Sequence, residues 1–198
     1  MQGAFAEHVA AFEELGARAS EVRTLAELDA VEAIVIPGGE STAIRKALDR
    51  TGLLAPLRDR IDAGLPAFGT CAGLIVLAHA APDKAPPCFG LMDVDVERNG
   101  FGRQVHSFEG DVRLLDLEHD DRHTQLHGVF IRAPRITRLG DDVEVLGTIA
   151  GGPFAGEPVV VRQGRLLGAT FHPELTGQRA VHDLFLRMVR GVVSHGHS

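Results

Sequence analysis

One of the two cysteines, Cys71, stands in a pattern that is typical of a nucleophile. Residues 68–73 read FGTCAG, so Cys71 lies between two glycines, after one apolar run and before another. This is the pattern of a nucleophile elbow, a sharp turn from strand to helix whose neighbours must lack bulky side chains. The start of the helix offers free N–H groups and the positive end of its dipole, which favour the thiolate. A buried structural cysteine is the alternative, because glycine pairs recur by chance in a chain with 23 glycines.

A thiolate needs a base and a group that orients the base, and residues 171–175 (FHPEL) offer both. Pro173 excludes a regular helix there and favours extended backbone. Residues two apart in an extended chain point the same way, so His172 and Glu174 can share one face. Glu174 would then accept the Nδ1 proton of His172 and leave Nε2 for Cys71. The alternative is a polar histidine with a structural role, since the chain has ten histidines.

A glycine-rich loop follows the first buried apolar run, at residues 36–42 (IPGGEST). Gly38 and Gly39 let the backbone approach a ligand closely, and their N–H groups can line an anion site. A plain turn followed by a helix cap at Ser41 and Thr42 is the alternative. The loop lacks the spacing and the lysine of a phosphate-binding P-loop, which disfavours nucleotide binding.

Two further segments carry arginines next to β-like runs, at residues 98–104 (RNGFGRQ) and 130–134 (FIRAP). An arginine here can hold a substrate carboxylate in a bidentate pair, or it can simply be exposed in a turn. A metal site is not expected, because the chain has no HExxH and no paired CxxC.

The elements that must position these motifs alternate in the first half of the chain. We expect strands at 33–36 and 66–69, and helices at 5–15, 41–50, 53–63 and 72–79, which favours a parallel sheet covered by helices. The second half is β-rich and ends in a helix at 178–193, with β-like runs at 92–97, 105–109, 129–131, 143–148, 159–162 and 166–171. The last two runs form a hairpin candidate. The sequence therefore predicts an α/β fold in three layers, a mostly parallel central sheet flanked by helices, in a single domain spanning residues 1–198.

Composition narrows the class of protein. The chain has 198 residues, a formal net charge of −7, 44% hydrophobic and 24% charged residues, which is ordinary for a soluble globular protein. The acidic balance argues against nucleic acid as a partner, and the longest apolar stretch, 72–81, is too short to span a membrane. Cys71 and Cys88 form no disulfide framework, and the N-terminus does not resemble a signal peptide, so we expect a cytoplasmic protein with reduced thiols.

Taken in order, PGGEST, GTCAGL, RNGFGRQ, FIRAP and FHPEL resemble the motifs of the triad-type (class I) glutamine amidotransferases. The resemblance is strongest to the glutaminase subunits of pyridoxal 5'-phosphate synthases, and it covers essentially the full chain. It implies hydrolysis of L-glutamine to L-glutamate and ammonia, without metal or cofactor. The ammonia would reach a separate synthase (lyase) subunit in a large hetero-oligomer that makes pyridoxal 5'-phosphate, a form of vitamin B6. It also implies little activity until the synthase docks.

The resemblance assigns roles residue by residue. Cys71 would be the nucleophile, His172 the general acid and base, and Glu174 the orienting carboxylate. The oxyanion hole would consist of the N–H groups of Gly39 and Ala72. The glutamine-binding positions would be Gly38, Gly39, Glu40, Arg98, Ile131 and Arg132.

One departure concerns the N-terminus, because members of the family carry a strand before the turn that here begins at Gln2. We expect this first strand to be missing from the chain. Two alternatives to the assignment remain open. One is another triad-type glutaminase, such as that of histidine biosynthesis. The other is a binding relative that has lost catalysis. We expect no role for Cys88.

Overall fold

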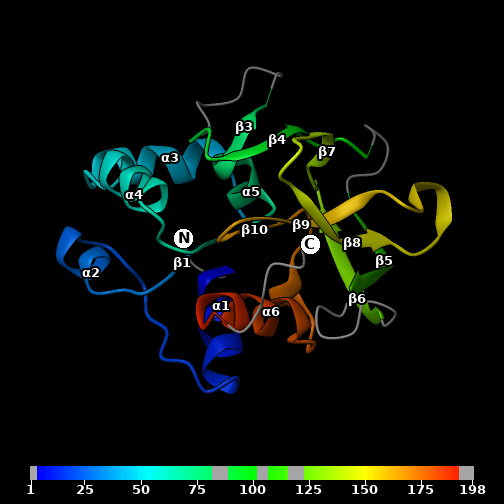
Figure 1. Ribbon diagram of the computed structural model, residues 1–198, viewed down its shortest axis with the longest axis horizontal. Coiled ribbons are helices and arrows are strands. Elements are labelled where there is room, and N and C mark those ends of the chain that lie inside the picture. The colour runs from blue at the N-terminus through cyan, green and yellow to red at the C-terminus, as the bar shows by residue number, and fades with distance from the viewer. Residues whose placement is uncertain (1–3, 82–88, 102–106, 116–122, 192–198) are drawn as a thin grey trace.

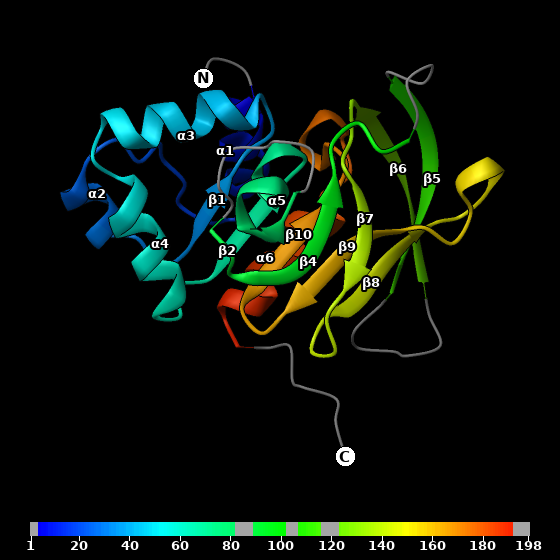
Figure 2. The ribbon, with the colours of Figure 1, turned by 90° about the horizontal axis from the view of Figure 1, so that it is seen from above.

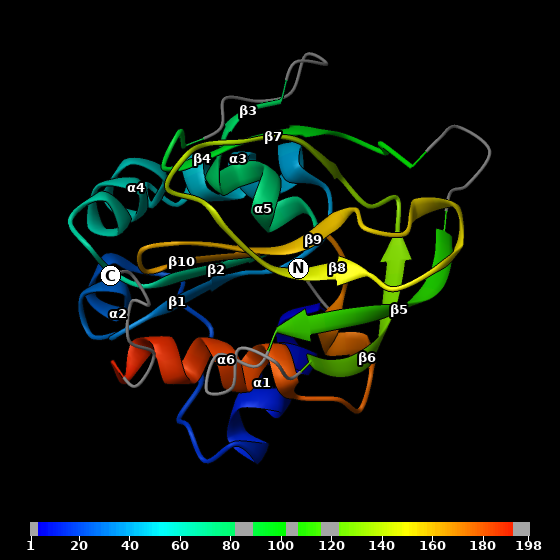
Figure 3. The same ribbon diagram turned by 45° about the vertical axis from the view of Figure 1, so that its right-hand side comes forward.

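The computed structural model describes residues 4–81, 89–101, 107–115 and 123–191. A seven-stranded sheet lies between two helical layers (Figures 1 and 3). One layer holds α1 (Ala4–Glu14) and α6 (Ala180–Val189), and the other holds α3 (Ser41–Arg50), α4 (Leu54–Asp62) and α5 (Ala72–Leu77). The short helix α2 (Leu25–Asp29) connects α1 to the first strand. The α/β class and the three layers are therefore confirmed.

The sheet is mixed rather than mostly parallel. Its order is β1 (Ile34–Ile36), β2 (Ala67–Thr70), β10 (Leu166–Ala169), β9 (Pro158–Gln163), β8 (Glu144–Ile149), β5 (Ser107–Leu115), β6 (His123–Ile131). Only the β1–β2 and β2–β10 pairs are parallel, and the other four pairs are antiparallel. Short connections such as the predicted hairpin between β9 and β10 leave no room for the crossover that a parallel pair needs. The parallel part of the sheet is the part that carries Cys71.

A second, three-stranded sheet consists of β3 (Ala78–Ala80), β4 (Met92–Glu97) and β7 (Arg135–Leu139). The predicted helix 72–79 ends at Leu77, because Ala78 pairs with Met92 of β4 instead of continuing the helix. Long-range strand pairing thus overrides the local apolar pattern. Neither α2, which Thr24 and Glu27 close with a capping box, nor β7 was expected.

The core has two hydrophobic clusters, one on each face of the sheet. Phe68 of β2 points toward α1 and α6, where its ring centroid lies 5.4 Å from that of Phe185. Its neighbour Ala67 belongs to the opposite cluster, with Leu74 of α5 and Ile36 of β1. Successive side chains of β2 therefore point to opposite faces of the sheet and pack against both helical layers.

Several predicted features lie outside the described residues. These are Gln2 at the expected turn, Cys88, and residues 102–104 of the RNGFGRQ segment. As far as the described residues go, β1 is one edge of the sheet. No described helix combines the length and apolar character needed to cross a membrane.

Helix α5 packs against β1 through Gly73. A Cβ atom at this position would overlap the carbonyl oxygen of Ile36 and lie 2.8 Å from its carbonyl carbon. Because both contacts are with backbone, the overlap cannot be relieved by rotating a side chain. The second glycine of the FGTCAG motif is thus required by close packing between a helix and a strand.

We expect Gly73→Ala to lower the free energy of unfolding by about 1–3 kcal/mol, because the added methyl group forces α5 and β1 apart. Urea titration of the variant and the parent protein measures the change. Gly151→Ala is the control, since a Cβ at Gly151 meets nothing within 4 Å. Equal stability of Gly73→Ala and the parent protein would contradict this packing argument.

Candidate active site

The parallel strands bring three predicted segments to one edge of the sheet. Strands β1, β2 and β10 run in the same direction, so their carboxyl ends lie side by side (Figure 2). The glycine-rich loop follows β1, Cys71 follows β2, and the segment with His172 follows β10. Ligand sites of α/β sheets form at such edges, because the loops there converge.

Cys71 occupies a strained turn between β2 and α5. Its backbone has φ 49° and ψ −106°, a left-handed conformation that residues with a Cβ rarely adopt. Its N–H donates to the carbonyl oxygen of Ala169 at 2.8 Å, which ties the turn to β10. A Cβ at Gly69 would lie 2.6 Å from the carbonyl carbon of Gly73, so the turn closes on itself too tightly for another residue type. The structure therefore gives Cys71 the geometry of a nucleophile elbow.

His172 lies between Cys71 and Glu174 and is in contact with both. Its Nδ1 lies 2.8 Å from Oε1 of Glu174, and the Cys71 side chain is close enough to its ring to raise the pKa of His172. The sulfur of Cys71 also lies 3.8 Å from the carbonyl oxygen of Ile131. The backbone N–H of His172 donates to Val129 of β6 at 2.9 Å, which fixes the segment in place. Cysteine, imidazole and carboxylate thus form one connected row.

Burial is the largest influence on the pKa of His172, and it disfavours the charged ring. Hydrogen bonds to Cys71 and Glu174, together with the negative charges of both, outweigh burial and raise the pKa to about 10. His172 therefore carries a proton at neutral pH, and an imidazolium beside the sulfur stabilises a thiolate.

The glycine-rich loop lies directly against the imidazole. A Cβ at Gly38 would overlap Cε1 of His172 and lie 2.9 Å from its Nδ1. Gly39 has φ 144°, a conformation open to glycine. Glu40, rather than Ser41 or Thr42, caps α3, because its carboxylate accepts from the N–H groups of Thr42 and Ala43 at 2.9 and 2.8 Å.

Arg98, the residue directly after β4, contacts the same loop. Its Nη2 donates to Oε1 of Glu40 at 3.1 Å, so two predicted glutamine-binding residues contact each other. Arg132 is exposed, has φ 44°, and follows Ile131 at the end of β6. Asn99, beside Arg98, has φ 52°. The three described non-glycine residues with positive φ thus all belong to segments that converge on this site, as is common at functional sites.

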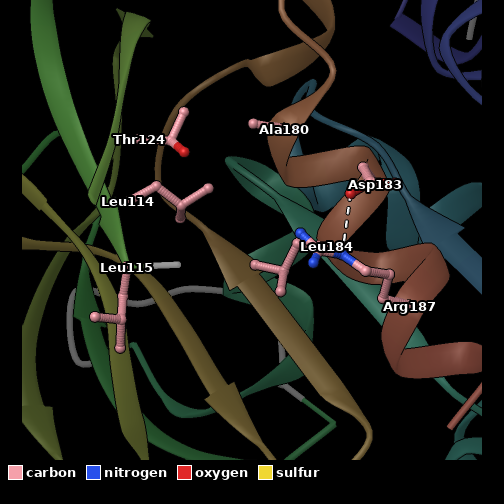
Figure 4. Close-up of a pocket in the computed structure, with 7 residues that line it drawn as sticks. All are labelled: Leu114, Leu115, Thr124, Ala180, Asp183, Leu184 and Arg187. Atoms are coloured by element: carbon pink, nitrogen blue, oxygen red, sulfur yellow. Dashed lines mark ion pairs between the residues drawn. The ribbon is translucent and has the colours of Figure 1, made fainter. Parts of the chain in front are cut away.

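A cavity of about 300 Å³ lies elsewhere, between β5, β6 and α6 (Figure 4). Leu114 and Thr124 line it from the strands, and Asp183 pairs with Arg187 on the helix side at 3.0 Å. None of the predicted site residues lines it. Residues 116–122, outside the described part, adjoin it in sequence, so we do not treat it as a site.

Similarity to known proteins identifies the family of this chain. The SNO glutamine amidotransferase family matches residues 1–191. The chain belongs to this family. A relative from Mycobacterium sp. (strain JLS) is called pyridoxal 5'-phosphate synthase subunit PdxT. It is 51% identical to this chain, and the match covers 96% of this chain and 89% of the relative. The protein of the same name from Acidothermus cellulolyticus is 50% identical, and the match covers 96% of this chain and 90% of that protein.

A solved structure of a glutamine amidotransferase has the same fold as this member of the family. The two share 43% identity and a TM-score of 0.83, covering 96% of this chain and 95% of the other. The structure of PurLQS from Thermotoga maritima, at 15% identity and a TM-score of 0.65, shares the fold alone. Membership of the family makes the chain a glutamine amidotransferase, which is the enzyme class that the motifs predicted.

Two side chains that no motif indicated, His8 and His182, lie behind the row. His8 of α1 lies 3.4 Å from Oε2 of Glu174 and 3.3 Å from Oγ1 of Thr70. His182 of α6 lies 2.9 Å from His8. A signal was present, since His8 falls in the same helical stripe as Phe12, four residues later. A polar residue on a buried helix face needs a partner, and that partner lies far away in sequence.

We expect Gly38→Ala to slow alkylation of Cys71 by iodoacetamide about tenfold or more, because the methyl group displaces the imidazole that stabilises the thiolate. The rate is measured by mass spectrometry at neutral pH. Gly177→Ala is the control, because a Cβ there meets nothing within 4 Å. An unchanged alkylation rate in Gly38→Ala would show that the ring is not held against the loop.

The buried histidine of α6 predicts how stability depends on pH. Burial and the positive charges of His8 and Arg179 lower the pKa of His182 to about 3, whereas an unfolded chain has the ordinary value. Between these values the unfolded state binds more protons, so stability is fully present above about pH 6.5 and falls as the pH drops toward 3. We expect His182→Phe to show a shallower fall, measured by urea unfolding between about pH 7 and pH 5. Parallel curves would contradict this.

Proposed function

We propose that the chain hydrolyses L-glutamine to L-glutamate and ammonia at Cys71 and delivers the ammonia to a synthase subunit that makes pyridoxal 5'-phosphate. The observation that carries the proposal is the buried row of Cys71, His172 and Glu174 on a strained elbow, in a member of a glutamine amidotransferase family. The relatives named pyridoxal 5'-phosphate synthase subunit PdxT, at about half identity over nearly the full chain, supply the metabolic context.

The first half of the reaction makes a thioester. The Cys71 thiolate attacks the side-chain amide carbon of glutamine, and the carbonyl oxygen becomes an oxyanion. His172 gives its proton to the nitrogen, the C–N bond breaks, and ammonia leaves. Glu174 keeps the Nδ1 proton on the far side of the ring and stabilises the imidazolium.

The second half hydrolyses the thioester. Water attacks the acyl carbon while His172 accepts its proton, the C–S bond breaks, and L-glutamate leaves with Cys71 restored as thiolate. In both halves the oxyanion would accept hydrogen bonds from the N–H groups of Gly39 and Ala72, each lowering the barrier by about 3 kcal/mol. The N–H of Ala72 lies in the first turn of α5, where helix N–H groups lack an acceptor within the helix.

Substrate recognition falls to the loops around the row. Gly38 and Gly39 admit the glutamine side chain close to backbone, while Arg98 and Arg132 supply positive charge for its α-carboxylate. Glu40 holds both the start of α3 and Arg98, so it sets where that charge lies. We infer that Glu40 also faces the α-ammonium group of the substrate once Arg98 turns to the carboxylate.

The partner is a second protein that consumes the ammonia. The relatives are called subunits, which supports assembly of this chain with a synthase subunit in a large hetero-oligomer. Docking would complete the oxyanion hole at Gly39, so hydrolysis is coupled to the presence of the ammonia acceptor. We place the reaction in the cytoplasm, because the nucleophile must remain a reduced thiol.

We expect ammonia release from glutamine to be low in the isolated protein and to rise strongly when the cognate synthase subunit is added. Cys71→Ala is expected to reduce the rate of the complex by at least about 10⁴-fold, because the nucleophile is lost. His172→Asn loses nearly as much and Glu174→Gln less. Ammonia is measured with coupled glutamate dehydrogenase.

Labelling with a chloroketone analogue of glutamine supplies the control. Covalent label on Cys71 and none on Cys88 supports the proposal. High activity alone that the synthase leaves unchanged would remove the partner from the proposal, while the triad would stand. No label and no ammonia under any condition would favour a relative that binds without catalysis.

A further inference from the structure

Two buried histidines lie behind the row, on the side of Glu174 away from Cys71. His8 comes from α1 and His182 from α6, two helices that lie together beneath the sheet (Figures 1 and 3). They are 4% and 0% exposed, and Nδ1 of His8 lies 2.9 Å from Nε2 of His182. Within the described residues no group of three or more His, Cys, Asp or Glu side chains is placed to hold a metal ion. The contacts of the pair are therefore explained by hydrogen bonding.

The carboxylate of Glu174 has one oxygen that the triad does not use. Its side chain is fully buried, and Oε1 is taken by His172 at 2.8 Å. Oε2 is also buried, and no described residue forms a hydrogen bond with it. Nε2 of His8 lies 3.4 Å from it. An ionised carboxylate in such a place needs a proton facing it, because an unpaired buried charge is strongly unfavourable.

The contacts fix which ring nitrogens carry protons. An ionised Glu174 only accepts, so Nε2 of His8 must carry the hydrogen that faces Oε2. Nδ1 of a neutral His8 is then an acceptor, and Nε2 of His182 must donate to it. Nδ1 of His182 is left as a bare lone pair, which agrees with the finding that this buried atom has no hydrogen-bond partner among the described residues.

Burial keeps His8 neutral. Burial has the largest effect on its pKa and lowers it. The negative charge of Glu174 raises the pKa, the positive charge of His172 lowers it, and the negative charge of Glu7 on the same helix raises it, with a net lowering. For His182, burial and the charges of His8 and Arg179 all lower the pKa, as described above. Both rings are therefore neutral at neutral pH, as the order of protons requires.

We propose that His8 is a positioning residue of the glutaminase: its Nε2–H holds the free oxygen of Glu174, and His182 fixes the tautomer of His8. This rests on the proposed function. The same Nε2 lies 3.3 Å from the hydroxyl of Thr70, the residue before Cys71, so one side chain of α1 contacts both segments of the triad. Held this way, the carboxylate of Glu174 keeps the ring of His172 turned toward the sulfur.

Two substitutions at position 8 separate this role from packing. His8→Leu replaces the imidazole with an apolar side chain of similar size and so removes the donor. His8→Gln places an amide N–H near the position of Nε2. In the complex with the synthase, we expect His8→Leu to lower kcat about 10- to 100-fold with KM for glutamine unchanged, and His8→Gln to recover most of the loss.

The pH dependence gives a second readout that packing does not move. Without His8 the free oxygen of the buried Glu174 carboxylate loses the donor that faces it, so Glu174 holds the protonated ring of His172 less firmly. The acid limb of the kcat profile then moves to higher pH in His8→Leu and returns in His8→Gln. Leu184→Ala on α6, which removes buried volume, is the control and leaves the limb in place while lowering the melting temperature.

Alkylation of Cys71 by iodoacetamide repeats the test without glutamine or synthase. When Glu174 holds the ring of His172 less firmly, His172 keeps its proton less well and stabilises the thiolate less, so His8→Leu is alkylated more slowly at low pH. The alkylation experiment tests the role of His8 even if the parent complex releases no ammonia. That second result would contradict the proposed function and not the role of His8. If His8→Leu does not fold, His182→Phe is used, and it is expected to change kcat and the acid limb in the same direction but less.

Three results would overturn the proposal. One is a wild-type pH profile in His8→Leu, or in His182→Phe when that variant replaces it. Another is equal impairment of His8→Gln and His8→Leu. The third is a shifted acid limb in Leu184→Ala, which would mean that any loss of packing beneath the sheet has the same effect.

Discussion

The left-handed turn at Cys71 is the constraint on which the rest of the structure depends. A residue with a Cβ persists at φ 49° only when its surroundings leave it no alternative. Strand β2 is paired on both sides, Cys71 donates to Ala169, and α5 is pressed onto β1 through Gly73. The strained turn directs the sulfur toward the edge of the sheet, where the loops after β1, β6 and β10 meet it.

A second feature of the site is that its ionisable side chains are buried. Cys71, His172 and Glu174 lie in a row with little access to water, and the two outer side chains raise the pKa of the imidazole between them. The row continues through His8 to His182, so groups from the ends of β2 and β10 and from both helices below the sheet contribute to one network. The packing of the helices beneath the sheet and the position of Glu174 are therefore linked through contacts of the same side chain, His8.

In the glycine-rich loop, the side chain of Glu40 supports a helix and contacts a second segment at the same time. Glu40 closes the first turn of α3 with two backbone hydrogen bonds and also pairs with Arg98. A helix cap is a rigid support, because it satisfies N–H groups that otherwise lack acceptors. The position of Arg98 is thus coupled to the start of a helix, and the glycines before Glu40 remain free to approach a ligand.

The α/β class, the elbow and the pairing of His172 with Glu174 were determined by the sequence itself, since each depends on residues close together in the chain. Glycines around Cys71 and a proline between His172 and Glu174 act on local backbone geometry. The mixed sheet, the end of α5 at Leu77 and the contact of His8 with His182 were decided only by tertiary structure. Strands pair, and buried polar groups find partners, across separations as long as 174 residues, and no local pattern records such contacts.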